Sequence, residues 1–473
     1  MHQTLFGALI VGVGLAATAP GQDVPVAVVH ARIITAAGPE IADGTLVVRG
    51  GVIVAVGAAV TVPVGARVID GTGKVVMPGL VDTHSHIGGV GGADQSGAIQ
   101  PEVRVADSIN PFDSGYRRAV AGGQTTINVM PGSGHLLSGQ TVYLKLRGGV
   151  EAGSAARIID QMLIHRRGAD GTPDVKSPAM GGLKMANGTN SIGAPPFSGT
   201  RGKSAAMVRE RFIKAQEYRA KWTKYAEEIV AGKEDVEPPE RDLAQEALLE
   251  ALAGTRIVHH HTHRADDIMT VLRLQKEFGF RVVLHHVSEA WKVAGEIAQA
   301  EKDSGGKVLG CSVILVDSPG GKLEASELLM ETCGVLEDAG VSTCIHTDDW
   351  INDARLFLRC GAMAVRFGMS RDGAVKALTI DGARMLDLAD RVGSLEAGKD
   401  ADFVILSGDP FSTYTHVEQT WVEGRMVYDR ANPEHFLYAT GGYGAGRDQE
   451  PYLCCAPGGG FTFGGKQWNG VGE

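Results

Sequence analysis

The sequence has no long basic run and no apolar stretch long enough to cross a bilayer comfortably. Its 473 residues include 45 Lys and Arg against 55 Asp and Glu, which gives a net charge of −10. Nucleic-acid binding needs clustered positive charge to neutralise phosphates, so this balance argues against a nucleic-acid partner. The apolar stretch at residues 5–16 is shorter than the roughly 20 residues that a transmembrane helix requires.

That stretch is instead typical of a cleaved export signal. Small residues follow it, and Ala17-Thr18-Ala19 and Ala19-Pro20-Gly21 each offer a small-x-small cleavage pattern. The positive residues that usually precede such a stretch are missing, because only His2 could carry a charge there. We expect residues 1–21 to be a signal peptide and the mature protein to be periplasmic or secreted, with no membrane span.

Cysteine is scarce, and two common catalytic motifs are missing. Four of the six cysteines lie among apolar residues and are expected to be buried thiols: Cys311, Cys333, Cys344 and Cys360. Cys454 and Cys455 lie in a Gly-rich tail, as either a vicinal pair or exposed thiols. No G-x-S-x-G occurs, so a nucleophile-elbow serine hydrolase is unsupported. Two G-x-x-x-x-G-K matches, at residues 393–399 and 460–466, lack the Ser or Thr of a phosphate-binding loop.

Strand and helix patterns divide the chain into parts. Short β-branched runs with Gly turns fill residues 24–77 and return within residues 389–430, which favours one small β-sandwich formed by both ends of the chain. Residues 78–388 alternate apolar strands with amphipathic helices, as in an α/β fold with a (β/α)8 TIM barrel. A charged helical insertion at about 200–252 is expected to be a solvated excursion, a lid or an oligomer contact. Residues 431–473 form a Gly-rich tail, for which we expect disorder or loose surface packing.

The first candidate site residues are His84 and His86, at the end of an apolar strand. Side chains two positions apart on a strand share a face, so both imidazoles can leave its carboxyl end together. Barrel enzymes place their chemistry at that end, and imidazole is the commonest protein ligand for metals. The pattern therefore predicts part of a metal site.

Further histidines fall on later strands. Four of them occupy five consecutive positions: His259, His260, His261 and His263. Position along the strand makes His261 or His263 the candidate for the site, whereas we interpret His259 and His260 as structural. His285 and His286 face opposite ways, so only one of them can enter the barrel.

A carboxylate completes the pattern, because Asp348 shares a face with His346 at the end of the last strand. A carboxylate beside imidazoles can bind a metal and accept a proton from water, whose pKa falls to near 7 on coordination. Each residue alone has a simple structural explanation. Four strand ends that all finish in His or Asp are not expected by chance.

This constellation resembles the amidohydrolase superfamily over about residues 27–428. Residues 77–86 are similar to its first barrel strand and metal motif, and residues 378–410 to its exit from barrel to sandwich. More narrowly, residues 109–148 and 261–268 resemble exported members near the imidazolonepropionase-like and Xaa-Pro-dipeptidase-like branches.

The resemblance implies a ligand set for a divalent metal, with zinc as the default: His84, His86, His261, His286 and Asp348. Asp348 would also serve as the general base or acid. Lys184 is the best match to a fourth-strand lysine that, in binuclear relatives, carries CO₂ and bridges two metals. If Lys184 does not bridge, one metal remains on His84, His86, His261 and Asp348.

Three more residues are expected to line the substrate pocket: His263, Arg264 and His135. Arg264 could clamp a substrate carboxylate through its planar guanidinium, or could remain a surface residue at a helix start. His135 follows an earlier strand and lies within a Gly-rich turn.

The sequence therefore predicts an exported, metal-dependent hydrolase that cleaves a C–N bond in a small amide or dipeptide-like molecule. One alternative is a mononuclear cyclic-amide hydrolase or deaminase, for which one metal and a dispensable Lys184 would be expected. The other is a non-catalytic binding protein on the same fold. The exact substrate, the metal and the oligomeric state stay open, although barrels of this kind often form homo-oligomers.

Overall fold

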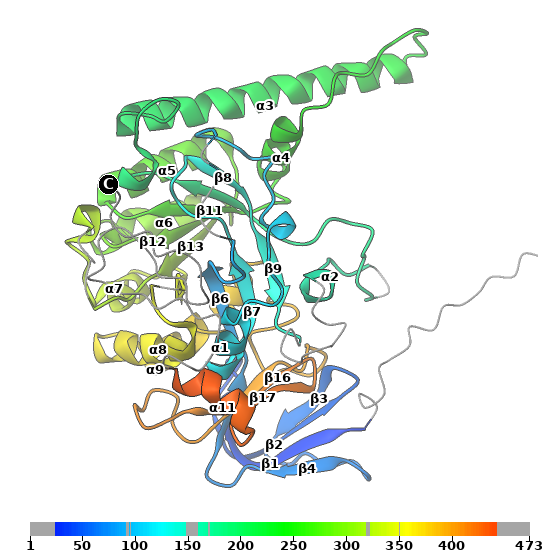
Figure 1. The fold of residues 1–473 in the computed structure, drawn as a ribbon, viewed down its shortest axis with the longest axis vertical. Helices are drawn as coiled ribbons and strands as arrows, with labels where there is room; N and C mark the ends of the chain where they lie inside the picture. Colours follow the sequence, from blue (N-terminus) through cyan, green and yellow to red (C-terminus); the bar gives the residue numbers. More distant parts are fainter. Residues whose placement is uncertain are drawn as a thin grey trace, which may run out of the picture.

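The computed structural model describes residues 24–90, 94, 96–147, 159–168, 171–317, 322–349 and 351–441. The predicted signal peptide, Cys454 and Cys455 lie outside these residues, as does most of the predicted Gly-rich tail. Helices and strands are mixed along the chain, and both ends of the described part meet at one end of the molecule (Figure 1).

One eight-stranded sheet combines strands from both ends of the chain. Its order is β17-β16-β15-β5-β1-β2-β3, with β4 paired to β1. The link between the two ends is the antiparallel pair of β5 and β15, in which Met77 faces Val404. Phe403 stacks on Trp421 in its core, with ring centroids 5.3 Å apart. The strands are β1 (Val26–Ile33), β2 (Ile41–Arg49), β3 (Val52–Gly57), β4 (Arg67–Asp70), β5 (Val75–Pro78), β15 (Phe403–Leu406), β16 (Val417–Val422) and β17 (Arg425–Asp429).

The middle of the chain forms two further sheets, ordered β14-β13-β12-β11-β10-β8 and β6-β7-β9. The strands β10 to β14 are parallel, and most of their residues are buried, as expected when helices cover one face and side chains fill the other. The strands are β6 (Leu80–Ser85), β7 (Gln124–Val129), β8 (Leu137–Gln140), β9 (Val142–Lys145), β10 (Leu183–Ala186), β11 (Val258–Thr262), β12 (Val282–His286), β13 (Val308–Val313) and β14 (Thr343–Ile345).

The direction of β8 and β9 differs from the parallel arrangement that the sequence predicts. These strands form one extended stretch interrupted at Thr141, which runs antiparallel to β10 on one side and to β7 on the other. The physical reason is the short connection, because only residues 130–136 separate β7 from β8. A parallel partner would need a crossover of about a dozen residues or more.

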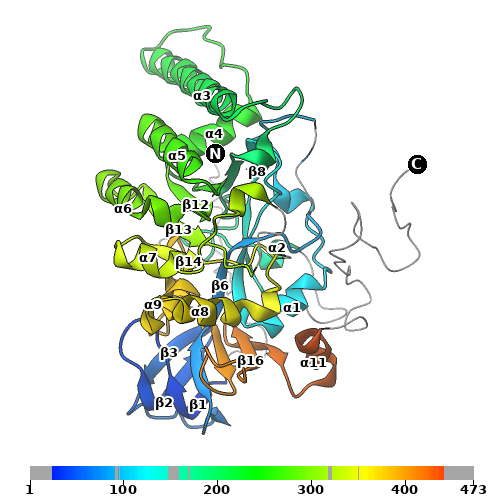
Figure 2. The same cartoon turned by 90° about the vertical axis from the view of Figure 1, so that its left-hand side faces the viewer.

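Helices line the outer side of the parallel strands, where α5, α6, α7 and α8 lie in a row (Figure 2). In the chain, these four helices follow β11, β12, β13 and β14 in turn, and a loop connects the carboxyl end of each strand to its helix. Those loops carry the candidate site. These helices are α5 (Ala265–Phe278), α6 (Ala294–Asp303), α7 (Thr332–Asp338) and α8 (Phe357–Arg366); the others are α1 (Gly115–Ala121), α2 (Ile159–Met162), α9 (Arg371–Ala377), α10 (Ile380–Arg384) and α11 (Pro433–Thr440).

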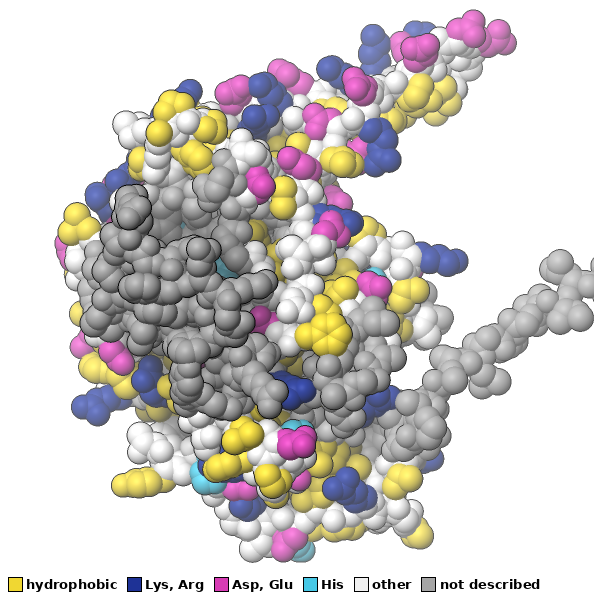
Figure 3. Space-filling model, in the orientation of Figure 1, with side chains coloured by type: hydrophobic (Ala, Val, Ile, Leu, Met, Phe, Trp, Pro, Cys, Tyr) yellow, Lys and Arg dark blue, Asp and Glu magenta, His cyan; other side chains and the backbone are white. Residues whose placement is uncertain are grey.

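The region of the predicted insertion contains the long helix α3 (Arg201–Val230) and α4 (Leu243–Leu252). The Thr200 side chain caps α3, and Phe212 packs between Phe278 and Phe280. The carboxyl half of α3 projects from the body, with Lys, Arg, Asp and Glu side chains intermixed along it (Figures 1 and 3). Among the described residues, no helix is long and apolar enough to cross a membrane.

The four cysteines predicted to be buried thiols are confirmed as such. Cys311, Cys333, Cys344 and Cys360 are free and buried. Burial raises the pKa of each of these thiols, which makes them packing groups rather than nucleophiles.

Candidate metal centre

Side chains from the carboxyl ends of several strands converge on Asp348, which follows β14. Its Oδ1 lies 3.1 Å from Nε2 of His86 and 3.5 Å from Nε2 of His84. Its Oδ2 lies 3.7 Å from Nδ1 of His286. The predicted residues from β6, β12 and β14 are thus brought together around one carboxylate.

Asp348 is held in an unusual backbone conformation, with φ at +52°. Non-glycine residues adopt this region rarely, and it recurs at functional sites. Burial alone would raise the pKa of the Asp348 carboxyl. The hydrogen bond and charge of His86 outweigh that effect and lower the pKa to about 2. Asp348 is therefore a carboxylate at neutral pH, able to bind a cation or accept a proton.

Lys184 on β10 reaches the same place. Its Nζ lies 3.1 Å from Nε2 of His84, and the side chain is fully buried. Burial lowers the pKa of the Lys184 ammonium to about 7, although the charge of Asp348 opposes the shift. A buried lysine beside a histidine and a carboxylate is not a surface residue, which was the structural alternative for this position.

His84 on β6 and His86, which directly follows it, are each anchored on the nitrogen that points away from Asp348. Nδ1 of His86 lies 2.8 Å from the carbonyl oxygen of Met130, and Nδ1 of His84 lies 3.2 Å from Nδ1 of His285. Metal-binding histidines usually donate their second ring N–H to an acceptor, which fixes the ring. Both Nε2 atoms are therefore prepared for a shared ligand.

Two buried nitrogens supply a test of whether a metal fits here. Nδ1 of His261 and Nε2 of His286 have no hydrogen-bond partner among the described residues, and the two ring centroids lie 4.4 Å apart. Buried polar atoms without partners are rare and costly. His84, His286 and Asp348 also offer ligand atoms within 4.8 Å of one another. Imidazoles with a carboxylate suit a divalent metal, so the donor set fits the ion.

Two other groups of side chains offer ligand atoms close together, namely His84, His285 and His346, and His261, His263 and Glu324. A lysine already fills the last of them. Nζ of Lys322 lies 2.8 Å from Nε2 of His263, 3.3 Å from Nε2 of His261 and 3.3 Å from Oε1 of Glu324. An ammonium at the centre of three acceptors opposes a cation there. The group around Asp348, which combines imidazoles with a carboxylate, is therefore the stronger candidate for a metal.

Sequence reasoning missed Lys322 and Asp82. Lys322 stands in a loop, where no periodic pattern signals its direction. Oδ1 of Asp82 accepts the backbone N–H groups of His84 and Thr347, and its Oδ2 accepts the Thr347 hydroxyl. Asp82 thus ties β6 to the turn that carries Asp348. Its place two residues before His84, on the same strand face, could have revealed it.

The remaining predicted residues lie in different surroundings. His263 stacks on His286, with ring centroids 5.1 Å apart, so it lies beside the site. Arg264 pairs with Asp266 and leaves 43% of its side chain exposed. His135 is buried against Phe197, with ring centroids 5.0 Å apart.

Comparison with known proteins points to one family. A model of the amidohydrolase family matches residues 242–428. An amidohydrolase structure from Thermotoga maritima is 30% identical, covers 86% of this chain and 100% of its own, and superposes with a TM-score of 0.73. Amidohydrolase tasK of Hapsidospora irregularis is 29% identical over 78% of this chain, and imidazolonepropionase of Bacteroides fragilis is 32% identical over 19%. This chain spans only 38% and 24% of those two proteins.

Proposed function

This chain belongs to the amidohydrolase superfamily as a metal-dependent hydrolase with a mixed α/β fold, and we propose that it cleaves the C–N bond of a small amide or dipeptide-like molecule. The observation that carries this proposal is the convergence of His84, His86, Lys184 and His286 on the carboxylate of Asp348. His84, His286 and Asp348 offer ligand atoms within 4.8 Å of one another, which supports a site for a divalent ion. Zinc is the ion that we propose, since imidazoles and a carboxylate suit it.

The ion would be held by five residues: His84, His86, His261, His286 and Asp348. A divalent ion bound there would lower the pKa of a water molecule and polarise the substrate carbonyl. Asp348 accepts the proton that water gives up and delivers it to the leaving nitrogen, because its carboxylate is ionised and faces the histidines. His263 stacks on His286 and lies beside the site, with Nε2 at 2.8 Å from Nζ of Lys322 and Nδ1 at 2.7 Å from the Ser288 hydroxyl.

Lys184 supports a site for two ions rather than one. Its amine is fully buried between Nε2 of His84 and Sδ of Met130, each 3.1 Å away. We propose that the amine carries CO₂, since a carbamate at this position would supply oxygen ligands for a second divalent ion. A mononuclear hydrolase or deaminase would not need a lysine at this position.

We also propose that the middle strands close into the barrel predicted from the sequence, as a domain of residues 78–388 beside a sandwich of residues 24–77 and 389–430. Backbone hydrogen bonds support closure on both sides. Thr141 and Tyr143 donate to the carbonyls of Gly182 and Met180, and Ser85 bridges to Asp349 in parallel register. The stretch β8–β9 would then be the third strand of the ring, in reversed direction.

The proposed activity is tested with Asp348→Asn on a panel of N-acyl amino acids, dipeptides and cyclic amides. We expect the variant to keep its metal and to lose about 10²–10⁴-fold in kcat, the range for a general base. Asp349→Asn is the matched control, because Asp349 is the neighbouring buried carboxyl, and burial raises its pKa to about 7. Hydrolysis of no member of the panel by metal-loaded wild type, with ligand binding retained, would indicate a binding protein.

We further propose that residues 1–21 direct export and are removed. Sequencing the amino terminus of the protein recovered from its native cells tests this directly. A mature terminus near residue 20 in the extracytoplasmic fraction would support export, and an intact Met1 in the cytosol would contradict it.

A further inference from the structure

A column of buried side chains descends from the candidate metal centre through the interior of the strands. Nδ1 of His84 lies 3.2 Å from Nδ1 of His285, and Nε2 of His285 lies 2.9 Å from Nδ1 of His259. Nε2 of His259 in turn lies 2.9 Å from the hydroxyl of Tyr143. All four side chains are buried, with 2% exposure or less.

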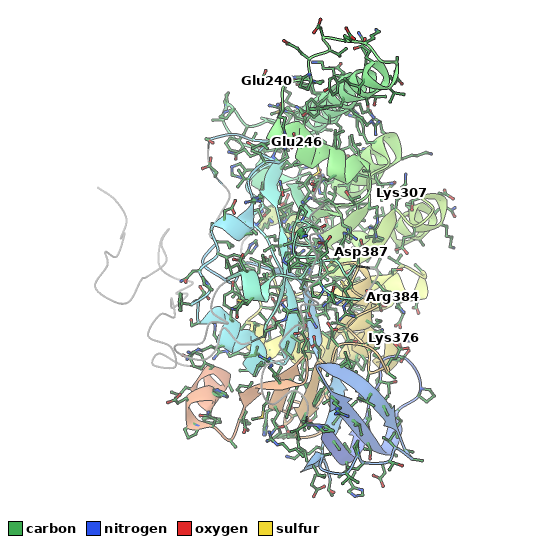
Figure 4. All side chains as sticks on the ribbon, turned by 90° about the vertical axis from the view of Figure 1, so that its right-hand side faces the viewer. Glu240, Glu246, Lys307, Lys376, Arg384 and Asp387 are labelled. Atoms are coloured by element: carbon green, nitrogen blue, oxygen red, sulfur yellow. The ribbon has the colours of Figure 1, made fainter. Side chains whose placement is uncertain are left out.

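The column connects the two ends of the strands. His84 lies near the carboxyl end of β6, His285 is the fourth residue of β12, and His259 is only the second residue of β11. Tyr143 at its foot also lines a cavity of about 230 Å³. The segments that precede β10 and β11 contribute to this cavity, and so does Asp387, which is labelled in Figure 4.

The chain makes specific room for the column. A Cβ atom on Gly182 would lie 2.2 Å from Cδ2 of the His259 ring, a distance at which one of the two must move. Glycine at position 182 therefore allows the backbone of the segment before β10 to pass beside the imidazole.

The hydrogen bonds of the column can run in two directions, because each contact allows either partner to donate. An unpaired buried charge is costly, so each ring is neutral and has one donor and one acceptor nitrogen. If His84 donates from Nδ1, then His285 must donate from Nε2 to His259, and His259 must donate from Nε2 to the Tyr143 oxygen. The Tyr143 hydrogen is then left to point towards the cavity, which is large enough to hold water.

The opposite direction would disable the metal centre. In this direction the Tyr143 hydroxyl would donate to Nε2 of His259, and Nδ1 of His259 would donate to Nε2 of His285. Nδ1 of His285 would then donate to Nδ1 of His84. Its proton would then sit on Nε2, the nitrogen that faces Asp348. The tautomer of His86 is fixed, because its Nδ1 faces the backbone carbonyl of Met130, which can only accept a hydrogen bond.

We propose that Tyr143, His259 and His285 are positioning residues that keep Nδ1 of His84 protonated and its Nε2 free to bind a metal. This inference rests on the proposed metal centre. It assigns a role to two histidines that we interpreted as structural or as outside the site. It also makes Tyr143, at the far end of the strands, a determinant of metal affinity.

Zinc affinity, measured by competition with a chromophoric chelator, is the first test. His259→Leu should weaken zinc binding by about 10–100-fold, the range for residues that orient metal ligands. Tyr143→Phe keeps the ring and its packing and removes only the hydroxyl, so we expect a smaller loss with the protein fully folded. His260→Leu is the matched control, because His260 is the next residue of β11, is equally buried, and bonds a backbone carbonyl outside the column. We expect His260→Leu to change affinity by less than about threefold.

Nitrogen NMR of histidine-labelled, metal-free protein is the second test and needs no activity. We expect wild-type His84 to be protonated at Nδ1 alone, and His259→Leu or Tyr143→Phe to give a mixture of tautomers. If both variants fold and keep the wild-type His84 tautomer and zinc affinity, the proposed role of Tyr143, His259 and His285 is wrong. Failure of the wild-type protein to bind zinc at all, with the predicted tautomer present, would instead contradict the proposed function.

Discussion

Nζ of Lys145 lies 2.6 Å from Oδ2 of Asp400 and 2.9 Å from Oδ2 of Asp402, and each of the three side chains is at most 2% exposed. Lys145 is the last residue of β9, and the two aspartates lie just before β15. The contact therefore joins the middle sheets to the sheet built from the chain ends. Removing one partner of a buried ion pair leaves an uncompensated charge. We expect Lys145→Met to lower the free energy of unfolding by about 3–5 kcal/mol, measured by urea denaturation.

The control for that variant is Lys74→Met. Lys74, just before β5, pairs with Glu418 on β16 at 3.3 Å in the eight-stranded sheet. These two side chains are 36% and 29% exposed. Exposed pairs contribute about 0–1 kcal/mol, so this variant should be nearly as stable as wild type. Equal losses in the two variants would show that the buried contact has no special role.

Asp82 is expected to act through the turn that carries Asp348. In Asp82→Asn the amide oxygen can still accept from the two backbone N–H groups, but the N–H₂ would face the Thr347 hydroxyl and the side-chain N–H₂ of Gln124, from which the other carboxylate oxygen now accepts. We expect zinc affinity and kcat/KM to fall together by about 10–100-fold. Asp70→Asn is the control variant. Asp70 accepts hydrogen bonds from the backbone N–H and the hydroxyl of Thr72, as Asp82 does from Thr347, but it lies at the surface. An Asp82→Asn variant with wild-type metal affinity would count against this role.

How much of this site the sequence predicts depends on where each residue stands. Strand periodicity and the strand-end rule select His84, His86 and Asp348, which the structure brings together. Periodicity does not say which nitrogen of His261 is free, since that depends on neighbours from other strands. Lys322 lies in a loop and carries no pattern.

The same limit applies to the fold. The strand-rich ends were recognisable from their short β-branched runs, and they form one sheet. The reversal at β8 and β9 was not foreseen, although the Gly-containing connection at residues 130–136 is too short for a helix. Arg264 was considered for its charge, but Asp266, two residues later, pairs with it.

Lys322 should oppose metal binding, because its ammonium lies 3.3 Å from Nε2 of His261. Removing that charge also takes away one of the two ion-pair partners of Glu324 among the described residues and leaves it Arg201. We expect Lys322→Met to tighten zinc binding by about tenfold at low salt, by titration against a chelator. Lys307→Met, at a distant strand start, should have no effect. Weaker binding in Lys322→Met would show instead that Lys322 supports His261.

Metal removal should destabilise the folded chain, because the unfolded chain lacks the assembled site. An ion present at about 100 times its Kd stabilises by about 2.7 kcal/mol, so a chelator should lower Tm by several degrees. His84→Ala should melt at the same temperature with and without chelator. Superimposable melting curves of wild type in both conditions would argue that no ion is bound.

The most direct test of the metal centre is metal content per chain, by elemental analysis of protein purified without a histidine tag and loaded with zinc and bicarbonate. We predict close to two ions in wild type. We expect a clear fall in Lys184→Ala, because Lys184, which contacts His84, would supply the ligands of the second ion as a carbamate. A value close to one that Lys184→Ala leaves unchanged would contradict the two-ion centre and favour the mononuclear alternative. A wild-type protein with no bound metal would contradict the centre itself.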